Sequence, residues 1–151
     1  MAEVGFETLS VNYHMEFYGV NIEEQGPRMK AIAQEKGVEI TTLGYYCNAV
    51  QFEEHQHNLE RAIDAAHLYG AKIVSTFAGA YEGEPMEKSF EKFGEVFREL
   101  AKRAEDRGVR LAIENWSAPP ATSASIPARG SGCLKRSRAM QSAWSGSLRI
   151  R

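Results

Sequence analysis

The chain has 151 residues, enough for one domain with a sizeable core, and its 43% hydrophobic and 25% charged residues are typical of a globular protein. No run of about 18 apolar residues occurs, and the first residues lack the pattern of a secretory signal, which argues against a membrane protein. The two cysteines, Cys47 and Cys133, indicate neither a disulfide framework nor a paired metal-binding motif. We therefore expect a cytoplasmic protein.

The charge of the chain changes sign after Trp116. All 20 acidic residues lie at or before Glu114, where 12 basic residues leave a formal charge of about −8. Residues 117–151 hold six basic residues, eight serines and no acidic residue. We therefore predict two parts, an ordered region over 1–116 and an irregular basic, serine-rich tail over 117–151.

Four segments of the first part share one pattern, in which a glycine precedes a short apolar stretch typical of a β-strand. These segments begin at Gly5, Gly37, Gly70 and Gly108, at intervals of 32, 33 and 38 residues. Apolar residues recur at helical spacing before each of the last three glycines. Since glycine adopts the left-handed conformation without steric cost, these three glycines predict helix ends.

Alternating strands and helices predict parallel strands joined by right-handed crossovers. A repeat near 32 residues fits both a doubly wound sheet and a (β/α) barrel of eight units. No glycine-rich phosphate loop follows any of the strands, and residues 79–83 are too loosely spaced for a dinucleotide-binding motif. We therefore predict an α/β fold, a partial (β/α) TIM barrel of about four parallel strands.

Functional residues of such barrels lie at the carboxyl ends of strands. Glu114 is the sharpest candidate, because the apolar stretch 111–113 ends in its carboxylate, and a buried charge is costly unless it is paired or metal-bound. A glutamate at the start of a solvated loop fits the sequence equally well. His14 could contact a substrate hydroxyl, although a surface histidine is the commoner case. Asn48 could donate to a substrate oxygen or simply form a turn.

The segment 53–57, Glu-Glu-His-Gln-His, has the composition of a metal cluster. Acidic residues, however, suit the amino end of a helix, and His55 and His57 are two residues apart and so do not share a helical face. We interpret this segment as a solvated helix face.

Residues 1–116 resemble the sugar phosphate isomerase/epimerase family of xylose isomerase-like barrels. The segments that carry the resemblance are Leu-Gly-Tyr-Tyr-Cys-Asn at 43–48, the helix at 58–66, Thr-Phe-Ala-Gly at 76–79 and the strand ending Ile-Glu-Asn at 115. In that family the glutamate of the Ile-Glu-Asn motif is a divalent-metal ligand. The resemblance therefore implies that Glu114 is a metal ligand and a catalytic residue, with His14 and Asn48 as contacts to substrate hydroxyls.

The implied activity is a metal-dependent isomerisation or epimerisation of a small sugar or sugar phosphate, with Mn, Mg, Co or Zn as the metal. It implies no nucleic-acid or membrane partner, and it is compatible with a homo-oligomer. The family's first strand and its later ligands, an acid, a histidine and a second glutamate, have no counterpart here. We therefore expect a truncated, inactive chain that does not bind the metal tightly.

Two alternatives remain open. The first is metal-dependent phosphodiester cleavage in the manner of endonuclease IV, which the charge of about −8 over the ordered region disfavours. The second is a fragment without catalytic activity.

The tail is compatible with a shifted reading frame. Reading one base upstream permits Asn-Ile-Gly-Phe-Asn-Pro over 122–127, Glu-Ala-Val-Pro over 135–138 and Leu-Glu-Trp-Glu-Pro-Ala-His over 143–150. Segments like these follow the Ile-Glu-Asn strand in the family, in the same order. We interpret residues 117–151 as out of frame, and the alternative is an authentic basic tail that binds an acidic partner.

Overall fold

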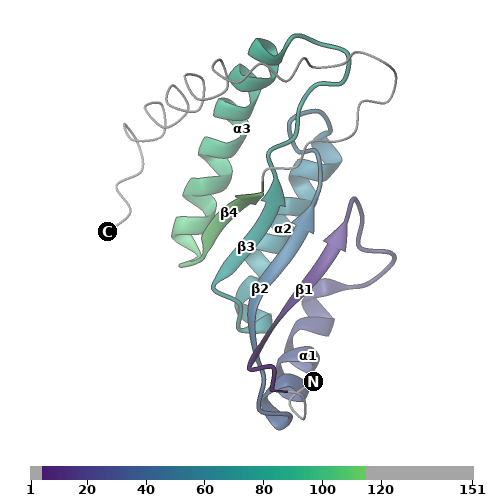
Figure 1. Cartoon of the computed structure of the whole chain (residues 1–151), viewed down its shortest axis with the longest axis vertical. Helices are drawn as coiled ribbons and strands as arrows, with labels where there is room; N and C mark the ends of the chain where they lie inside the picture. The colour runs from purple at the N-terminus through teal and green to yellow at the C-terminus, as the bar shows by residue number, and fades with distance from the viewer. Residues whose placement is uncertain (1–4, 115–151) are drawn as a thin grey trace. The chain divides into compact units, whose positions relative to one another are not determined.

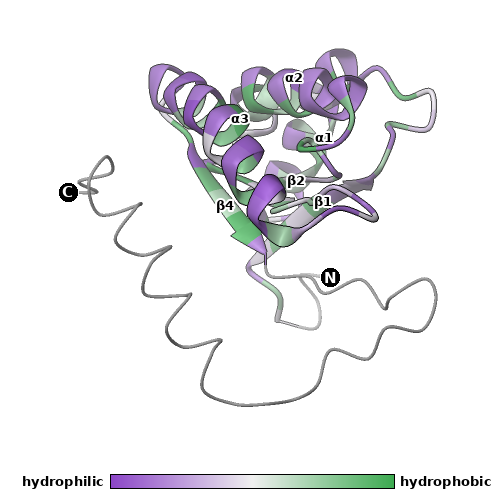
Figure 2. Cartoon of the chain, turned by 90° about the horizontal axis from the view of Figure 1, so that it is seen from above, coloured by the Kyte–Doolittle hydropathy of each residue, from purple (hydrophilic) through white to green (hydrophobic). Residues whose placement is uncertain are grey.

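The computed structural model describes residues 5–114, in which four strands alternate with three helices. The strands form one parallel sheet in the order β1-β2-β3-β4. All three helices lie on the same side of it (Figures 1 and 2). The elements are β1 (Thr8–His14), α1 (Ile22–Glu35), β2 (Glu39–Tyr46), α2 (Glu53–Tyr69), β3 (Ile73–Phe77), α3 (Met86–Asp106) and β4 (Arg110–Glu114). The predicted partial (β/α) barrel is thereby confirmed, whereas the expectations for residues 117–151 fall outside the described range.

The glycines that were expected to end the helices have the backbone conformation that this role requires. Gly37, Gly70 and Gly108 have φ values of 64°, 80° and 67°. Gly70 is the cap residue of α2, and its N–H donates to the carbonyl of His67 at 3.1 Å. None of the helices in residues 5–114 is long and apolar enough to cross a membrane.

The two faces of the sheet differ in composition because side chains alternate along each strand. The face toward the helices carries apolar residues, among them Leu43 and Val74, which are fully buried. They pack in one core with helix residues that include Leu59, Ile63 and Leu100. A register shift between Leu9 and Ser10 leaves Thr41 of β2 without a partner in β1, so that both Ile40 and Leu43 face the helices. This shift keeps the opposite face of β2 free for the polar and aromatic residues described below.

Arginine–carboxylate pairs tie the helices to one another. Arg61 of α2 donates to both carboxylate oxygens of Glu23 in α1, at 3.1 and 2.9 Å. Asp64 of α2 accepts two hydrogen bonds from Arg103, at 3.0 and 2.7 Å, and a third from Arg107 at 2.9 Å. The Arg103 hydrogen bonds, aided by Arg107, hold the pKa of the Asp64 carboxyl below its usual range despite some desolvation. Paired arginine forks of this kind are the strong form of the ion pair.

We predict that Asp64→Asn lowers the free energy of unfolding at pH 7 by about 1 kcal/mol, because it removes the charge that both arginines bind. A lowered folded-state pKa contributes stability above the unfolded-state value near 3.8, and this contribution disappears as pH falls through the folded-state pKa. The difference between variant and parent should therefore be smaller near pH 3 than at pH 7 in denaturant titrations. Glu95→Gln, which breaks an exposed pair with Lys92, is the control and should have no measurable effect. An equal cost of Asp64→Asn at both pH values would contradict the prediction.

Candidate functional site

A row of four side chains crosses the carboxyl ends of the strands on the face away from the helices. We call His14, Tyr46, Phe77 and Glu114 the mouth row. His14 pairs in register with Tyr46, and Phe77 with Glu114. The His14 ring stacks on Tyr46 with centroids 5.1 Å apart, and the Tyr46 and Phe77 centroids are 4.8 Å apart. The row therefore has two aromatic rings in its centre, an imidazole at one end and a carboxylate at the other.

A second row lies two residues earlier on each strand, on the same face of the sheet, and it explains how the Tyr46 ring is accommodated. Asn12, Gly44, Ser75 and Ala112 pair in register across the sheet. A Cβ on Gly44 would lie 2.8 Å from Cε2 of Tyr46 and would collide with the Asn12 side-chain oxygen. Ser75 Oγ donates to the Tyr46 hydroxyl oxygen at 3.0 Å. The missing side chain of Gly44 therefore leaves the space in which the Tyr46 ring lies.

The two ends of the mouth row, His14 and Glu114, lie on the outermost strands of the sheet. His14 and Glu114 are separated by three strand spacings of about 4.8 Å, or roughly 14 Å between their backbones. Both side chains are exposed, and the structure places both at the carboxyl ends of their strands, as their predicted roles require. They can contact opposite ends of one extended ligand.

Asn48, the third predicted site residue, lies beside the mouth row in the loop after β2. Its side-chain amide donates to the carbonyl of Ala80 at 2.7 Å and to Gln51 Oε1 at 3.3 Å. The amide oxygen accepts from the backbone N–H groups of Ala80 and Gln51, at 3.1 and 3.2 Å. All of these partners belong to the protein, and a direct contact between Asn48 and substrate stays a prediction.

The turn after β1 is strained where it borders the site. Met15 and Tyr18 have positive φ values of 63° and 52°, and residues other than glycine rarely adopt this backbone conformation. The Tyr45 hydroxyl donates to the carbonyl of Met15 at 2.6 Å, and the Tyr18 hydroxyl donates to the carbonyl of His14 at 2.9 Å. Burial raises the pKa of Tyr45 to about 12, so it remains a donor at neutral pH. Strain that the surroundings hold in place is common near functional sites.

The segment 53–57 was expected to be a solvated helix face, but two of its residues, His55 and Gln56, are half-buried. Glu53, Glu54 and His57 are exposed, but His55 is half-buried, and its Nδ1 accepts from the N–H of Asn48 at 3.2 Å. The sequence pattern missed this role because the partner belongs to the preceding loop. Within residues 5–114, no three His, Cys, Asp or Glu side chains come together as a metal site.

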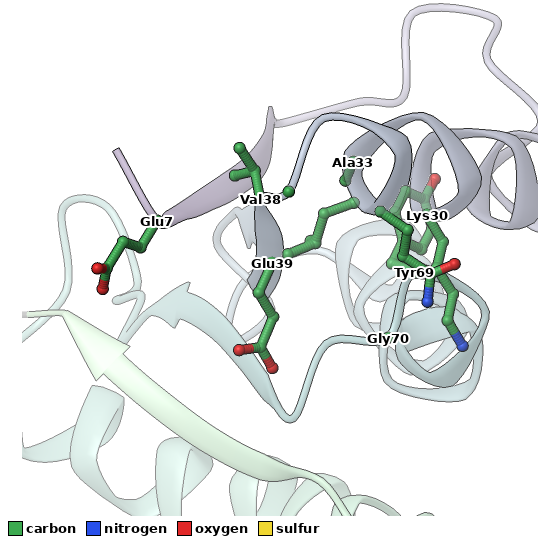
Figure 3. Close-up of a pocket in the computed structure, with 10 residues that line it drawn as sticks. Glu7, Lys30, Ala33, Val38, Glu39, Tyr69 and Gly70 are labelled. Atoms are coloured by element: carbon green, nitrogen blue, oxygen red, sulfur yellow. The ribbon is translucent and has the colours of Figure 1, made fainter. Parts of the chain in front are cut away.

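The described residues also form an open hollow of about 450 Å³, which lies at the opposite end of the strands from the mouth row. Figure 3 shows Glu7 and Glu39 on one side of it and Lys30 with Tyr69 on the other. In (β/α) barrels the amino ends of the strands serve stability, and the carboxyl ends carry the chemistry. We therefore assign the candidate site to the mouth row and not to this hollow.

Comparison with known proteins agrees with the observed fold. Residues 1–126 match the model of the xylose isomerase-like TIM barrel family, and the chain belongs to that family. No curated protein is significantly similar to the chain in sequence.

Solved structures with the same fold include enzymes of different classes. D-psicose 3-epimerase from Clostridium cellulolyticum H10, solved with D-tagatose, has a TM-score of 0.56 at 18% identity, covering 73% of this chain and 42% of that one. An AP endonuclease of family 2 from Brucella melitensis has a TM-score of 0.57 at 14% identity, covering 74% and 45%. The IOLI protein with a bound zinc atom has a TM-score of 0.54 at 15% identity, covering 74% and 42%. The chain thus spans less than half the length of each, and the likeness shows the fold.

We predict that Gly44→Ala lowers the free energy of unfolding by about 1–3 kcal/mol, because the added methyl must displace Asn12 and Tyr46 in a packed site. The matched control is Gly94→Ala in α3, where an added Cβ meets no atom within 4 Å. Replacing a helical glycine with alanine should raise stability by roughly 0.5–1 kcal/mol. Denaturant unfolding of both variants measures the difference, and equal effects would contradict the packing described for Tyr46.

Proposed function

We propose that the mouth row is part of the active site of a sugar or sugar-phosphate isomerase or epimerase. The observation that carries this proposal is the order of chemical groups along the row, in which two aromatic rings separate the carboxylate of Glu114 from the imidazole of His14. Membership of the xylose isomerase-like family and the fold shared with a D-psicose 3-epimerase support the same reaction class.

Each group of the row suits one part of such a reaction. The faces of Tyr46 and Phe77 offer apolar surface for the C–H groups of a sugar, and the polar rim of the row meets its hydroxyls. His14 has both a donor and an acceptor nitrogen for a hydroxyl at the far end of the substrate. Glu114 is the group of the row that can take a proton from the carbon next to a carbonyl, or hold a cation there. The span of roughly 14 Å leaves room for an extended sugar between the two ends.

A divalent ion fits this scheme at the Glu114 end. When bound, such an ion polarises the substrate carbonyl. Glu114 is exposed at the end of β4 and supplies one carboxylate, whereas hard divalent ions take about six or more oxygen ligands. The other protein ligands of such an ion would have to come from outside residues 5–114. Glu114 alone should therefore bind the ion weakly.

Phosphodiester cleavage is the rival reaction on this fold, and an AP endonuclease is among the structural neighbours. A polyanionic substrate calls for a basic surface, because phosphate contacts to lysine and arginine supply most of the affinity. The formal charge of about −8 up to Trp116, and the absence of lysine and arginine from the mouth row, favour the sugar reaction.

The metal role of Glu114 predicts where a paramagnetic ion binds. Substoichiometric Mn²⁺ should broaden the backbone amide NMR signals of residues near the end of β4, including Phe77, the register partner of Glu114. Glu114→Gln should abolish this broadening, because an amide is a much weaker ligand for a hard cation than a carboxylate. Glu39→Gln is the control, since Glu39 is an exposed carboxylate at the amino end of the same sheet. Broadening that survives Glu114→Gln, or that centres on Glu39, would refute the metal role.

The aromatic centre of the row predicts a contact with sugar. D-fructose at high concentration should shift the ring signals of Tyr46 and Phe77, and Phe77→Leu should weaken its binding about fivefold, since an aromatic stacking contact contributes roughly 1 kcal/mol. Phe52→Leu replaces an exposed ring outside the row and should leave the affinity unchanged. Saturation-transfer NMR measures the dissociation constant of D-fructose for both variants. Equal weakening by the two variants, or no shift of the row, would exclude the row as the sugar site.

A further inference from the structure

Two loops flank the centre of the mouth row, and side chains of the first loop join it to the second. The loop 47–52 follows Tyr46 at the end of β2, and the loop 78–85 follows Phe77 at the end of β3. Asn48 in the first loop pairs with both the N–H and the C=O of Ala80 in the second, at 3.1 and 2.7 Å. The side-chain amide thus bonds Ala80 as a neighbouring peptide group would in a sheet.

The amide of Asn48 uses its whole hydrogen-bonding capacity in this contact. An asparagine side chain has two donor hydrogens and two acceptor sites. One donor and one acceptor go to Ala80, and the others go to Gln51 Oε1 and the Gln51 N–H, at 3.3 and 3.2 Å. Gln51 Oε1 also accepts from the N–H of Glu82 at 3.1 Å, which adds a second link between the two loops. Aspartate could not replace asparagine here at neutral pH, since a carboxylate has no hydrogen to donate to the Ala80 carbonyl.

The surrounding residues are shaped to this contact. Gly79 has a φ of 72°, and a Cβ added there would lie 2.6 Å from the amide oxygen of Asn48. On the other side, the backbone N–H of Asn48 donates to His55 Nδ1, which fixes the loop against the start of α2. Glycine at 79 is therefore required twice, by the backbone conformation and by the close approach of Asn48.

We infer that Asn48 is a positioning residue that joins the two loops into one unit and so holds Tyr46 and Phe77 at a fixed spacing. For its consequence on substrate binding the inference rests on the proposed function of the mouth row. The link between the loops does not depend on which ligand the row takes.

Hydrogen exchange of single amides tests the link in the full 151-residue chain. At pH 7, Asn48→Ala should lower the protection of the Ala80 amide at least tenfold relative to the parent, because it removes the oxygen that accepts from the Ala80 N–H. Asn48→Asp keeps an acceptor, but its ionised carboxylate places a second oxygen against the Ala80 carbonyl oxygen, which Nδ2 contacts at 2.7 Å. This repulsion should separate the loops and lower the protection of Ala80 likewise. Gln51→Ala is the matched control, because it removes the contacts of Gln51 Oε1 with Glu82 and with Asn48 Nδ2 and leaves both bonds from Asn48 to Ala80. It should lower protection at Glu82 and keep protection at Ala80 within about threefold. Val74, buried in β3, reports whether each variant is folded.

Asn48→Asp gives a signature that loss of packing would not produce. A protonated carboxyl can again donate to the Ala80 carbonyl, and an ordinary aspartate titrates near 3.9. Near pH 3, where such a carboxyl is mostly protonated, protection of Ala80 in Asn48→Asp should therefore return to within about threefold of the parent at the same pH, while Asn48→Ala stays low. Should Asn48→Ala fail to fold, Asn48→Asp at the two pH values still tests the inference.

Protection of Ala80 that is unchanged in a folded Asn48→Ala variant would overturn the inference. A folded Asn48→Asp variant that does not recover near pH 3 would do the same. Both results are independent of the Mn²⁺ and D-fructose titrations. The hydrogen-exchange experiments can therefore refute the link between the loops without refuting the proposed function, and the titrations can refute the proposed function without refuting the link.

Discussion

The parallel register of the four strands is the constraint on which the rest of this structure depends. Because residues in register share a face, one apolar face can bury Leu43 and Val74 under the helices while the other brings together side chains from four distant parts of the chain. The one-residue shift at Thr41 is part of this register. Without it, either Ile40 or Leu43 would point away from the core, and the burial of β2 would be incomplete.

The site is built from small residues as much as from reactive ones. Gly44 and Ser75 lie under Tyr46, the first by leaving space and the second by donating to its hydroxyl. The ring therefore lies between His14 and Phe77 at stacking distance from both. An aromatic centre with an imidazole at one end and a carboxylate at the other supports the proposal of a ligand that is itself apolar on its face and polar at its rim. Sugars have this character, and phosphodiester backbones do not.

The loops around the row are held by polar contacts of a different kind. The Asn48 side chain hydrogen-bonds to the backbone of Ala80, and the Tyr45 hydroxyl donates to the backbone carbonyl of Met15. The loops that follow β1, β2 and β3 are therefore held by side chains from β2 or from the loop after it. The second strand and its loop thus organise the mouth. A central strand suits this task, since it has a neighbour on each side and its own ring and amide groups reach both.

Local sequence features determined the order and direction of the elements. Helical spacing of apolar residues and the glycines at 37, 70 and 108 marked each helix end, because those signals depend on the backbone of a few neighbouring residues. The placing of His14 and Glu114 at strand ends followed from the same pattern. Tertiary structure alone decided which residues meet. The stacking of His14 on Tyr46, the bond from Asn48 to His55 and the pairing of Asn48 with Ala80 depend on strand register and loop path. Those contacts join residues up to 32 positions apart, and no local pattern encodes them, because their free energy exists only once the sheet has formed.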